Sequence, residues 1–444
     1  MPWVAWGVLA ALAGCATYAP QPLDTTPRPR PDLSGLVVAS ADGHVFDPSD
    51  GLDITETAMV AVANNPELRV ARDGLAISRA QAFAAGLLPD PTISVAAEHP
   101  TGHVEGSNTN AFSLGLGYDI SALLRHSAEH AAAKQAQAQA AQELLWKEWQ
   151  VVAQARLLFV RNVEGARMLQ VLEDEKALFV DRQARLGRAF AAGNVTVDSV
   201  ATDLAELNGI EQKLADQERK LSQARHDLNA LLGLAPTLRL TLVGGDALPR
   251  FDAAAIRALV PTLGRIRPDL RALESGYLSQ EQKYRAAVMA QFPVLDVGFN
   301  RARDTSGIYT TGLNLSLSLP IFNRNRGNIA IEKATRAKLR DEYQSRLDAA
   351  AAGIDALLDD RALAERQLAE VRRSLAVLEQ LVRTSQSAFQ AGNIDIIAYV
   401  SQRDALLSKR LEMLALEQAL LEQQVGLQTL LGSQIPATDT VSPP

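Results

Sequence analysis

The sequence contains a single cysteine, Cys15, among its 444 residues. One thiol cannot form an intrachain disulfide or a metal site with several thiolate ligands. Aromatic residues make up only 5% of the chain, and the formal net charge is −7. Because nucleic-acid binding requires a basic surface, this acidic chain without a basic stripe is not expected to bind nucleic acid.

Long apolar runs are also missing. Beyond the N-terminal segment, no stretch reaches the ~18 to 20 apolar residues that a transmembrane helix needs, so any membrane-spanning part is expected to consist of β-strands. Nucleophile elbows, phosphate loops, Cys/His clusters and histidine–carboxylate constellations are absent, and Gly244-Gly245-Asp246 lacks a phosphate-binding context. We therefore expect no enzymatic activity, no metal site and no cofactor other than a covalent lipid.

The expected lipid is attached at Cys15, which follows a short apolar run in Leu12-Ala13-Gly14-Cys15. This pattern is similar to a bacterial lipoprotein signal. The resemblance implies that residues 1–14 are a signal peptide removed before acylation of the thiol, and Ala16 in place of Asp does not suggest inner-membrane retention. Met1-Pro2-Trp3 departs from the pattern because it lacks Lys or Arg. The alternative is a free cysteine buried in a short apolar helix.

The rest of the chain divides into a duplicated body with loose ends. Residues 15–50 are rich in proline and predict a lipid-anchored tether, and residues 434–444 predict a flexible tail. Similar motifs recur in the same order between them, which predicts two related halves, 51–245 and 246–433. The matched motifs are Asn65-Pro66-Glu67-Leu68-Arg69 with Arg267-Pro268-Asp269-Leu270-Arg271, Gly193-Asn194 with Gly392-Asn393, and Leu231-Leu232-Gly233 with Leu430-Leu431-Gly432.

Each half follows one plan. Short helices are expected at 54–64 and 67–87, matched by 253–259 and 269–290. Alternating strand pairs follow at 91–98 and 111–120, matched by 294–301 and 309–321. Proline-free helices at 122–191 and 327–391 would each be ~100 Å long.

Sevenfold spacing of apolar residues predicts that a return helix packs on each long helix as a coiled coil. The expected rows are Leu145, Val152, Phe159 and Ala166 with Leu207, Leu214, Leu221 and Leu228 in the first half. In the second half they are Ala350, Leu357, Ala364, Val371 and Leu378 with Leu406, Met413, Leu420 and Leu427.

Four strands with one apolar face cannot close a barrel alone, whereas three chains would supply a closed β-barrel of about twelve strands. Ser113, Gly115, Asn314, Ser316 and Ser318 would face water inside, and Leu114, Leu116, Leu313, Leu315 and Leu317 would face lipid, with Tyr118, Phe299 and Tyr309 in an aromatic girdle. The expected fold class is mainly α, with duplicated coiled-coil hairpins forming an α-barrel beyond a trimeric transmembrane β-barrel.

Three motifs, with the duplication, resemble the outer-membrane efflux protein family (TolC-like) over about residues 50–433. They are Asn64-Asn65-Pro66-Glu67-Leu68, the 86–91 passage Gly-Leu-Leu-Pro-Asp-Pro, and the 319–327 passage Leu-Pro-Ile-Phe-Asn-Arg-Asn-Arg-Gly. The resemblance implies a homotrimer in outer-membrane lipid with a periplasmic helical extension. It also implies docking to a periplasmic adaptor (membrane fusion) protein and an inner-membrane RND-type pump. The 322–329 passage Phe-Asn-Arg-Asn-Arg-Gly-Asn-Ile, which includes the Phe322–Gly327 turn, is most similar to the metal-cation branch (cobalt, zinc, cadmium), so divalent heavy metals are the expected cargo.

The resemblance further implies two functional regions at the far end of the helices. Gly193, Asn194, Gly392 and Asn393 mark the hairpin tips, where glycine permits the positive φ of a helix cap, and these tips would meet the adaptor. Asp198, Asp395 and Tyr399 would form a periplasmic gate, although the two aspartates could instead be first-turn residues favoured by the helix dipole.

Two histidine pairs, His126 with His130 and His99 with His103, are interpreted as surface residues rather than metal ligands. Two alternatives remain within the fold, a drug-export duct and a protein-secretion duct. From other classes, a lipid-anchored periplasmic coiled-coil scaffold or adaptor would lack the duplicated strand pairs, and a hydrolytic lipoprotein would need catalytic groups.

Overall fold

The computed structural model describes residues 18–36, 38, 46–101, 109–244 and 252–432. Its first half contains α2 (Ile54–Asn64), α3 (Pro66–Gly86), β1 (Thr92–Glu98), β2 (Ala111–Asp119), α4 (Ile120–Ala191) and α5 (Val197–Leu231). The second half repeats this order with α6 (Ala253–Leu259), η1 (Val260–Thr262), α7 (Leu263–Ile266), α8 (Pro268–Met289), β3 (Val294–Arg303), β4 (Tyr309–Ser318), α9 (Arg326–Gln390) and α10 (Ile396–Leu431). The expected element order is confirmed, except that η1 and α7 were not predicted.

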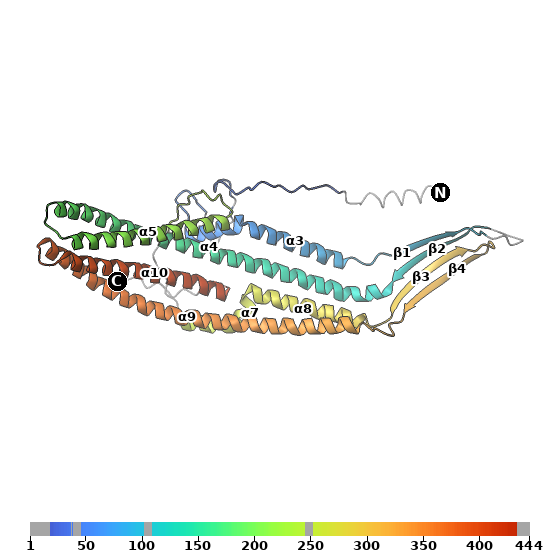
Figure 1. Ribbon diagram of the computed structural model, residues 1–444. Helices are drawn as coiled ribbons and strands as arrows, with labels where there is room; N and C mark the ends of the chain where they lie inside the picture. The colour runs from blue at the N-terminus through green and yellow to red at the C-terminus, as the bar shows by residue number, and fades with distance from the viewer. Residues whose placement is uncertain (1–17, 37, 39–45, 102–108, 245–251, 433–444) are drawn as a thin grey trace.

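The molecule is elongated, with a sheet at one end and two helical hairpins at the other (Figure 1). α4 and α9 contain 72 and 65 residues and run most of the length of the helical part. α3 and then α5 pack along α4, whereas α8 and then α10 pack along α9. The two halves join where α4 contacts α8 and α10. No helix among the described residues is both long and apolar enough to cross a membrane.

The duplication is visible in matching contacts at the centre of the molecule. In the first half, Asn65 caps α3 by accepting from Leu68 N at 2.9 Å and donates from Nδ2 to Leu231 O at 2.8 Å. Arg267 takes the same place in the second half and donates from Nη1 to Leu430 O at 2.8 Å. Each residue therefore satisfies a carbonyl at the end of its own return helix, which would otherwise lack an intrahelical partner.

The core of each helical hairpin is a coiled-coil seam, as the sevenfold spacing predicts. The predicted rows on α5, α9 and α10 are buried or half-buried. On α4 the period is right but the chosen row is wrong, because Leu145 and Ala166 are exposed. The buried row lies one residue earlier and consists of Val151, Leu158, Gly165, Leu172, Phe179 and Leu186.

The physical reason for the shifted row is that several helices cover α4. It contacts α5, α8 and α10. Apolar residues therefore occur in more than one row, as Phe159 does at 5% exposure, and periodicity alone does not say which row faces the return helix.

Part of the expected tether is attached to the fold. Residues 18–29 are exposed, but Arg30 N donates to Gly233 O at 3.0 Å and Ala235 N donates back to Arg30 O at 2.8 Å. Leu33, Leu36 and other apolar residues of this segment then pack against the core cluster around Leu228. The free part of the described tether therefore ends at about Arg30.

Candidate functional site

The sheet is the first candidate site, because it exposes apolar side chains that a soluble fold would cover. Its strands pair antiparallel in the order β1-β2-β3-β4. The register puts Ile93, Leu116, Phe299 and Leu313 side by side, and Val297 beside Leu315. Ile93 is 72% exposed and Leu313 84%. We call this surface the apolar face; its members are Ile93, Val95, Ala97, Phe112, Leu114, Leu116, Tyr118, Leu295, Val297, Phe299, Leu313, Leu315 and Leu317.

The opposite face of the sheet is polar. Ser94 pairs with Gly115, which pairs with Asn300, and Gly298 pairs with Asn314. The two faces therefore separate as the alternation predicts, with Ser113, Gly115, Asn314, Ser316 and Ser318 on one side and the predicted leucines on the other. β1 and β4 are the outer strands, and each leaves one edge without a partner in this chain.

The two joints between strands and long helices are built differently. Asp119 caps α4 by accepting from Ala122 N at 2.9 Å, and Ser121 Oγ accepts from Leu295 N at 2.6 Å, which ties this helix start to β3. In the second half, Arg324 and Asn325 both have positive φ, at 48° and 52°. Asn325 Nδ2 donates to Ala287 O at 2.8 Å, which fixes the Phe322–Gly327 turn against α8.

The hairpin tips, Gly193-Asn194 and Gly392-Asn393, are two copies of one turn. The glycine φ values are 74° and 75°. Asn194 N donates to Ala189 O and Asn393 N to Ala388 O, at 2.9 and 2.8 Å, which is the long hydrogen bond of a Schellman cap. A Cβ atom would meet nothing within 4 Å at either glycine. Glycine is therefore required by the positive φ and not by a lack of room for a side chain. The predicted capping role of the two glycines is confirmed.

The three gate candidates are not alike in the structure. Asp395 is exposed and is the N-cap of α10, where its carboxylate accepts from Ala398 N at 2.7 Å. Asp198 is an exposed first-turn residue of α5, whose cap is Thr196. Tyr399 is only 5% exposed and stacks on Phe389 with ring centroids 5.3 Å apart. Its side chain therefore lies inside the chain and does not join the two aspartates at the surface.

Beside Tyr399 lies a buried ion pair that sequence reasoning missed. Arg182 Nε donates to Asp203 Oδ1 at 2.6 Å, and the guanidinium lies 3.7 Å from the centroid of the Phe179 ring. Burial raises the pKa of Asp203 above its usual value, although the charge of Arg182 opposes this shift. A signal was present in the sequence, because the charged Asp203 lies in a sevenfold row on α5 with Ile210, Gln217 and Ala224.

Further ion pairs connect the helices in the same region. Arg403 of α10 binds Glu175 of α4, with Nε and Oε1 3.0 Å apart, and Lys213 of α5 contacts Asp404 of α10 at 3.2 Å. Burial, together with the nearby Asp404, raises the pKa of Glu206. The hairpins are thus held to each other by charged contacts as well as by apolar packing.

The histidine pairs do not form a metal site in the described part of the chain. The His126 and His130 rings lie 5.9 Å apart, but no group of three or more His, Cys, Asp or Glu side chains gathers anywhere in that part. His99 Nδ1 contacts Asn110 Oδ1 at 2.7 Å. His103, Cys15, residues 1–14 and residues 434–444 lie outside the described residues.

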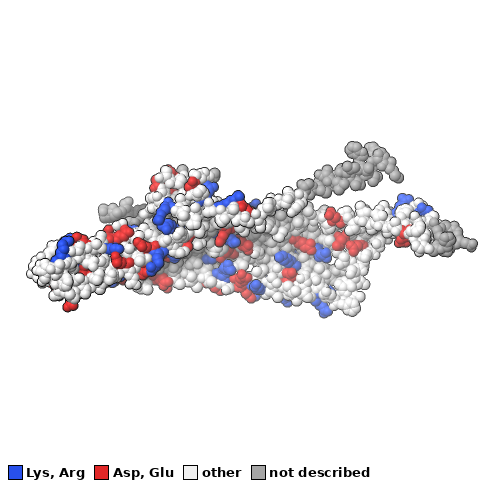
Figure 2. Space-filling view, turned by 45° about the horizontal axis from the view of Figure 1, so that its top comes forward, with Lys and Arg blue, Asp and Glu red and all other residues white. Residues whose placement is uncertain are grey.

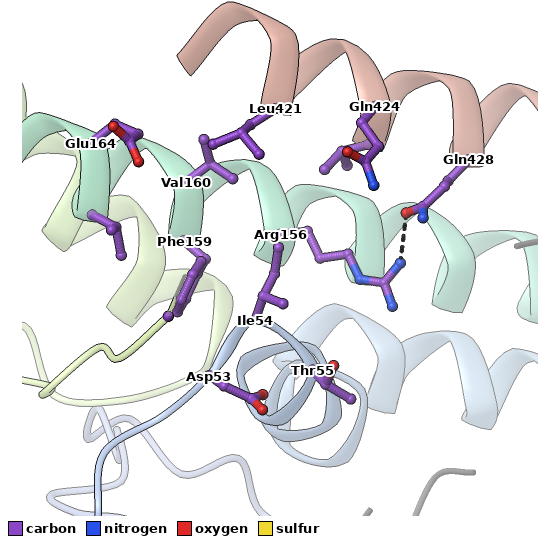
Figure 3. A pocket seen from close by; sticks show the side chains of 13 residues that line it. Asp53, Ile54, Thr55, Arg156, Phe159, Val160, Glu164, Leu421, Gln424 and Gln428 are labelled. Atoms are coloured by element: carbon purple, nitrogen blue, oxygen red, sulfur yellow. Dashed lines mark hydrogen bonds between the residues drawn. The ribbon is translucent and has the colours of Figure 1, made fainter. Parts of the chain in front are cut away.

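A cavity of about 590 Å³ lies between α2, α4 and α10 (Figure 3). Arg156 extends along it and donates from Nη1 to Gln428 Oε1 at 2.9 Å. Burial lowers the pKa of Arg156. The carboxylate of Asp53, at the edge of the cavity, caps α2 by accepting from Glu56 N at 2.7 Å. Its described lining also includes Thr55 and Glu164, and no histidine or cysteine.

Comparison with known proteins agrees with this geometry. Residues 262–433 match the outer membrane efflux protein family. The chain is 23% identical over 282 residues to the cation efflux system protein CusC of Escherichia coli K12, covering 60% of each chain. It is 28% identical over 264 residues to the cobalt-zinc-cadmium resistance protein CzcC of Cupriavidus metallidurans, covering 57% of each. The matched stretch thus spans about 60% of the length of these relatives.

Solved structures resemble nearly the whole fold. A structure of CusC aligns with a TM-score of 0.73 and 19% identity, covering 94% of this chain and 100% of that one. The Campylobacter jejuni CmeC outer membrane channel aligns with a TM-score of 0.75 and 16% identity, covering 95% of both chains. The open Neisseria gonorrhoeae MtrE channel gives a TM-score of 0.69 at 17% identity, covering 94% of this chain and 98% of that one. This chain therefore has the fold of these channels.

Proposed function

We propose that this chain, which carries an outer membrane efflux protein domain at residues 262–433 and has the fold of outer-membrane channels, is one subunit of a homotrimeric efflux duct. The duct lies in the outer membrane, extends into the periplasm and conducts its cargo passively to the exterior. No chemical step belongs to this function.

The exposed apolar face of the sheet is the observation that carries the proposal. Side chains such as Val95, 74% exposed, would remain in water in an isolated chain, at a cost of roughly 25 cal/mol per Å² of apolar surface. Contact with lipid removes this cost, but lipid also requires every backbone donor and acceptor to be paired. Pairing the free edge of β1 with the free edge of β4 in a second copy meets that requirement, and three copies of four strands close a barrel.

Divalent heavy-metal cations are the proposed cargo. The support is similarity to relatives named as a cation efflux protein and a cobalt-zinc-cadmium resistance protein. Deleting the gene is expected to raise sensitivity to zinc, cobalt or cadmium more than to lipophilic drugs, and a plasmid copy should restore growth. If drug sensitivity rises more, the chain belongs to a drug-export system of the same fold.

The hairpin tips are the proposed contact with a periplasmic adaptor protein and, through it, an inner-membrane pump of the RND type. Large apolar side chains are exposed near both tips, including Phe190 at 44%, Val197 at 62% and Ile397 at 50%. Such side chains support protein binding because their apolar surface is unused in this chain. Replacing Val197 and Ile397 with Ser is expected to weaken adaptor binding and leave trimer assembly intact.

Asp395 and Asp198 are proposed to form an acidic ring at the opening between the tips, since carboxylate rings select cations in pores. Asp395→Asn separates this role from capping, because asparagine is also a good N-cap but carries no charge. In planar bilayers we expect weaker block by divalent cations in this variant. Unchanged block would leave Asp395 with capping as its only role.

Cys15 is proposed to carry the lipid anchor. Cys15→Ser should abolish palmitate labelling while the trimer still inserts through its sheets. Normal labelling of the variant would overturn the assignment.

A further inference from the structure

Two arginines interrupt the apolar face near the free end of the sheet. Arg301 pairs with Leu114 and Thr311, and Arg303 pairs with Phe112 and Tyr309. Since paired residues share a face of the sheet, both guanidinium groups lie on the same side as the apolar face. Figure 2 shows basic side chains at this end of the molecule, with acidic atoms beside them.

Neither arginine is neutralised by a carboxylate in the described part of the chain. Ion pairs are found for many arginines of the helical part, but for neither of these two. Glu98 follows the alternation onto the opposite face of the sheet. Asp304 accepts from Ser306 N and Ile308 N, both at 2.9 Å, and so holds its own turn. Positive charge is therefore concentrated on the apolar side.

Both guanidinium groups lie close to the same aromatic ring. The Cζ atoms of Arg301 and Arg303 lie 5.8 and 5.7 Å from the centroid of the Tyr309 ring, within cation–π range. Phe112 contacts the same ring edge-on, with centroids 6.1 Å apart. Arg303 Nε is buried and has no hydrogen-bond partner among the described residues. Both guanidinium groups therefore lie within cation–π distance of Tyr309, with Arg301 exposed and Arg303 half-buried.

The position of the two arginines along the strands matches the boundary between the hydrocarbon core and the lipid headgroups. Moving along β3, the apolar row that ends at Phe299 is followed by Arg301 and Arg303, each two residues or ~6.7 Å further toward the loop end. Tyrosine is enriched at this boundary in membrane barrels. An arginine buried among acyl chains would be costly, whereas one at this height can reach the headgroups.

We propose that Arg301 and Arg303 bind the phosphate group of a lipid headgroup on the outer surface of the barrel, at its loop end. The proposal rests on the channel function, which places the apolar face against lipid. A planar guanidinium donates two parallel hydrogen bonds to phosphate oxygens, and two adjacent guanidinium groups match the charge of one phosphomonoester. The ordered lipid would hold the barrel at a fixed depth.

The test uses the full-length trimer in phosphatidylcholine nanodiscs that contain a minor fraction of diphosphoryl lipid A. Native mass spectrometry counts the phosphorylated lipid retained by wild type, by Arg301→Gln/Arg303→Gln, and by Arg340→Gln as an exposed control on α9. We expect at least about tenfold weaker retention in the double variant only. Inorganic phosphate is expected to compete poorly, and dephosphorylated lipid should not be retained.

Equal retention of lipid A by the wild type and the double variant would overturn the proposal, as would equal retention of dephosphorylated lipid. If the glutamine pair fails to assemble, Arg301→Lys/Arg303→Lys keeps the charge but loses the bidentate geometry. It should then retain the lipid several-fold more weakly, and retention equal to wild type would also overturn the proposal. Failure of the channel function would appear differently, as a wild-type protein that forms no trimer and conducts no ions.

Discussion

The glycines at the hairpin tips are the residues whose role the geometry defines most sharply. Gly392→Ala is expected to cost roughly 1 to 2 kcal/mol, because an L side chain at φ 75° is strained although nothing occupies the space. Gly187→Ala is the matched control, since Gly187 is exposed inside α4 and meets no neighbour either. Alanine there should stabilise the helix by about 1 kcal/mol.

Hydrogen exchange of the Asn393 amide measures the destabilisation of the tip by Gly392→Ala, because this N–H donates to Ala388 O across the tip. We expect faster exchange in Gly392→Ala, and unchanged or slower exchange of the α4 amides in Gly187→Ala. Equal shifts of both variants in one direction would contradict the conformational explanation.

Asp203 supplies a pH-dependent prediction. Burial raises the pKa of its carboxyl above the unfolded value of 3.8, so the folded state favours the protonated form. The free energy of unfolding of the α4–α5 hairpin is therefore highest below pH 3.8 and falls as the pH rises through the raised pKa. Asp203→Asn should reduce this fall, with Glu206, whose pKa is also raised, supplying what is left, whereas Asp198→Asn, on the exposed side of the same helix, should keep the whole fall. Amide exchange along α5 as a function of pH distinguishes these outcomes.

At the scale of whole elements, the sequence alone predicts the helices and strands to within a few residues, because their signals are local. Proline at 66 and 268, the alternation from Leu313 to Leu319 and the Gly-Asn turns all act through the backbone of their own segment. The buried row of α4 was not predicted, because it depends on which neighbouring helices cover Val151 and Phe179.

The candidate site residues also divide into those with a local signal and those that depend on packing. Capping by Gly193 and Gly392 is local and was predicted, whereas the stacking of Tyr399 on Phe389 depends on how α9 and α10 pack. The Arg182–Asp203 pair joins two helices and was missed, although a charged residue in a sevenfold row was a visible signal. The placement of Arg301 and Arg303 on the apolar face was missed because it depends on the register of three strands.

The two faces of β4 provide a direct test of the sheet. Leu315 is 67% exposed on the apolar face, and the adjacent Ser316 lies on the polar face. Leu315→Lys is expected to destabilise the membrane-inserted barrel by about 2 to 4 kcal/mol, because a charge near the centre of the bilayer is poorly solvated. Ser316→Lys should insert normally and reduce the conductance of cations. Heat-modified mobility of the extracted barrel and bilayer recordings compare the two. Equal insertion of both variants would mean that the apolar face does not contact lipid.

At the scale of the whole molecule, the sheet of a single chain is open. Within the described part of this chain, the outer edges of β1 and β4 have no partner strand. In the proposed trimer, repetition of the chain around an axis would close both the sheet and the layer of helices. Such a closed tube of helices and strands would enclose a path between its two ends.

Assembly and conduction measured on one preparation test this account most directly. Full-length protein extracted in detergent should have the mass of a trimer by light scattering corrected for bound detergent. When added to a planar lipid bilayer, it should give discrete, stable current steps. A monomer that remains soluble without detergent and produces no current steps would contradict the account.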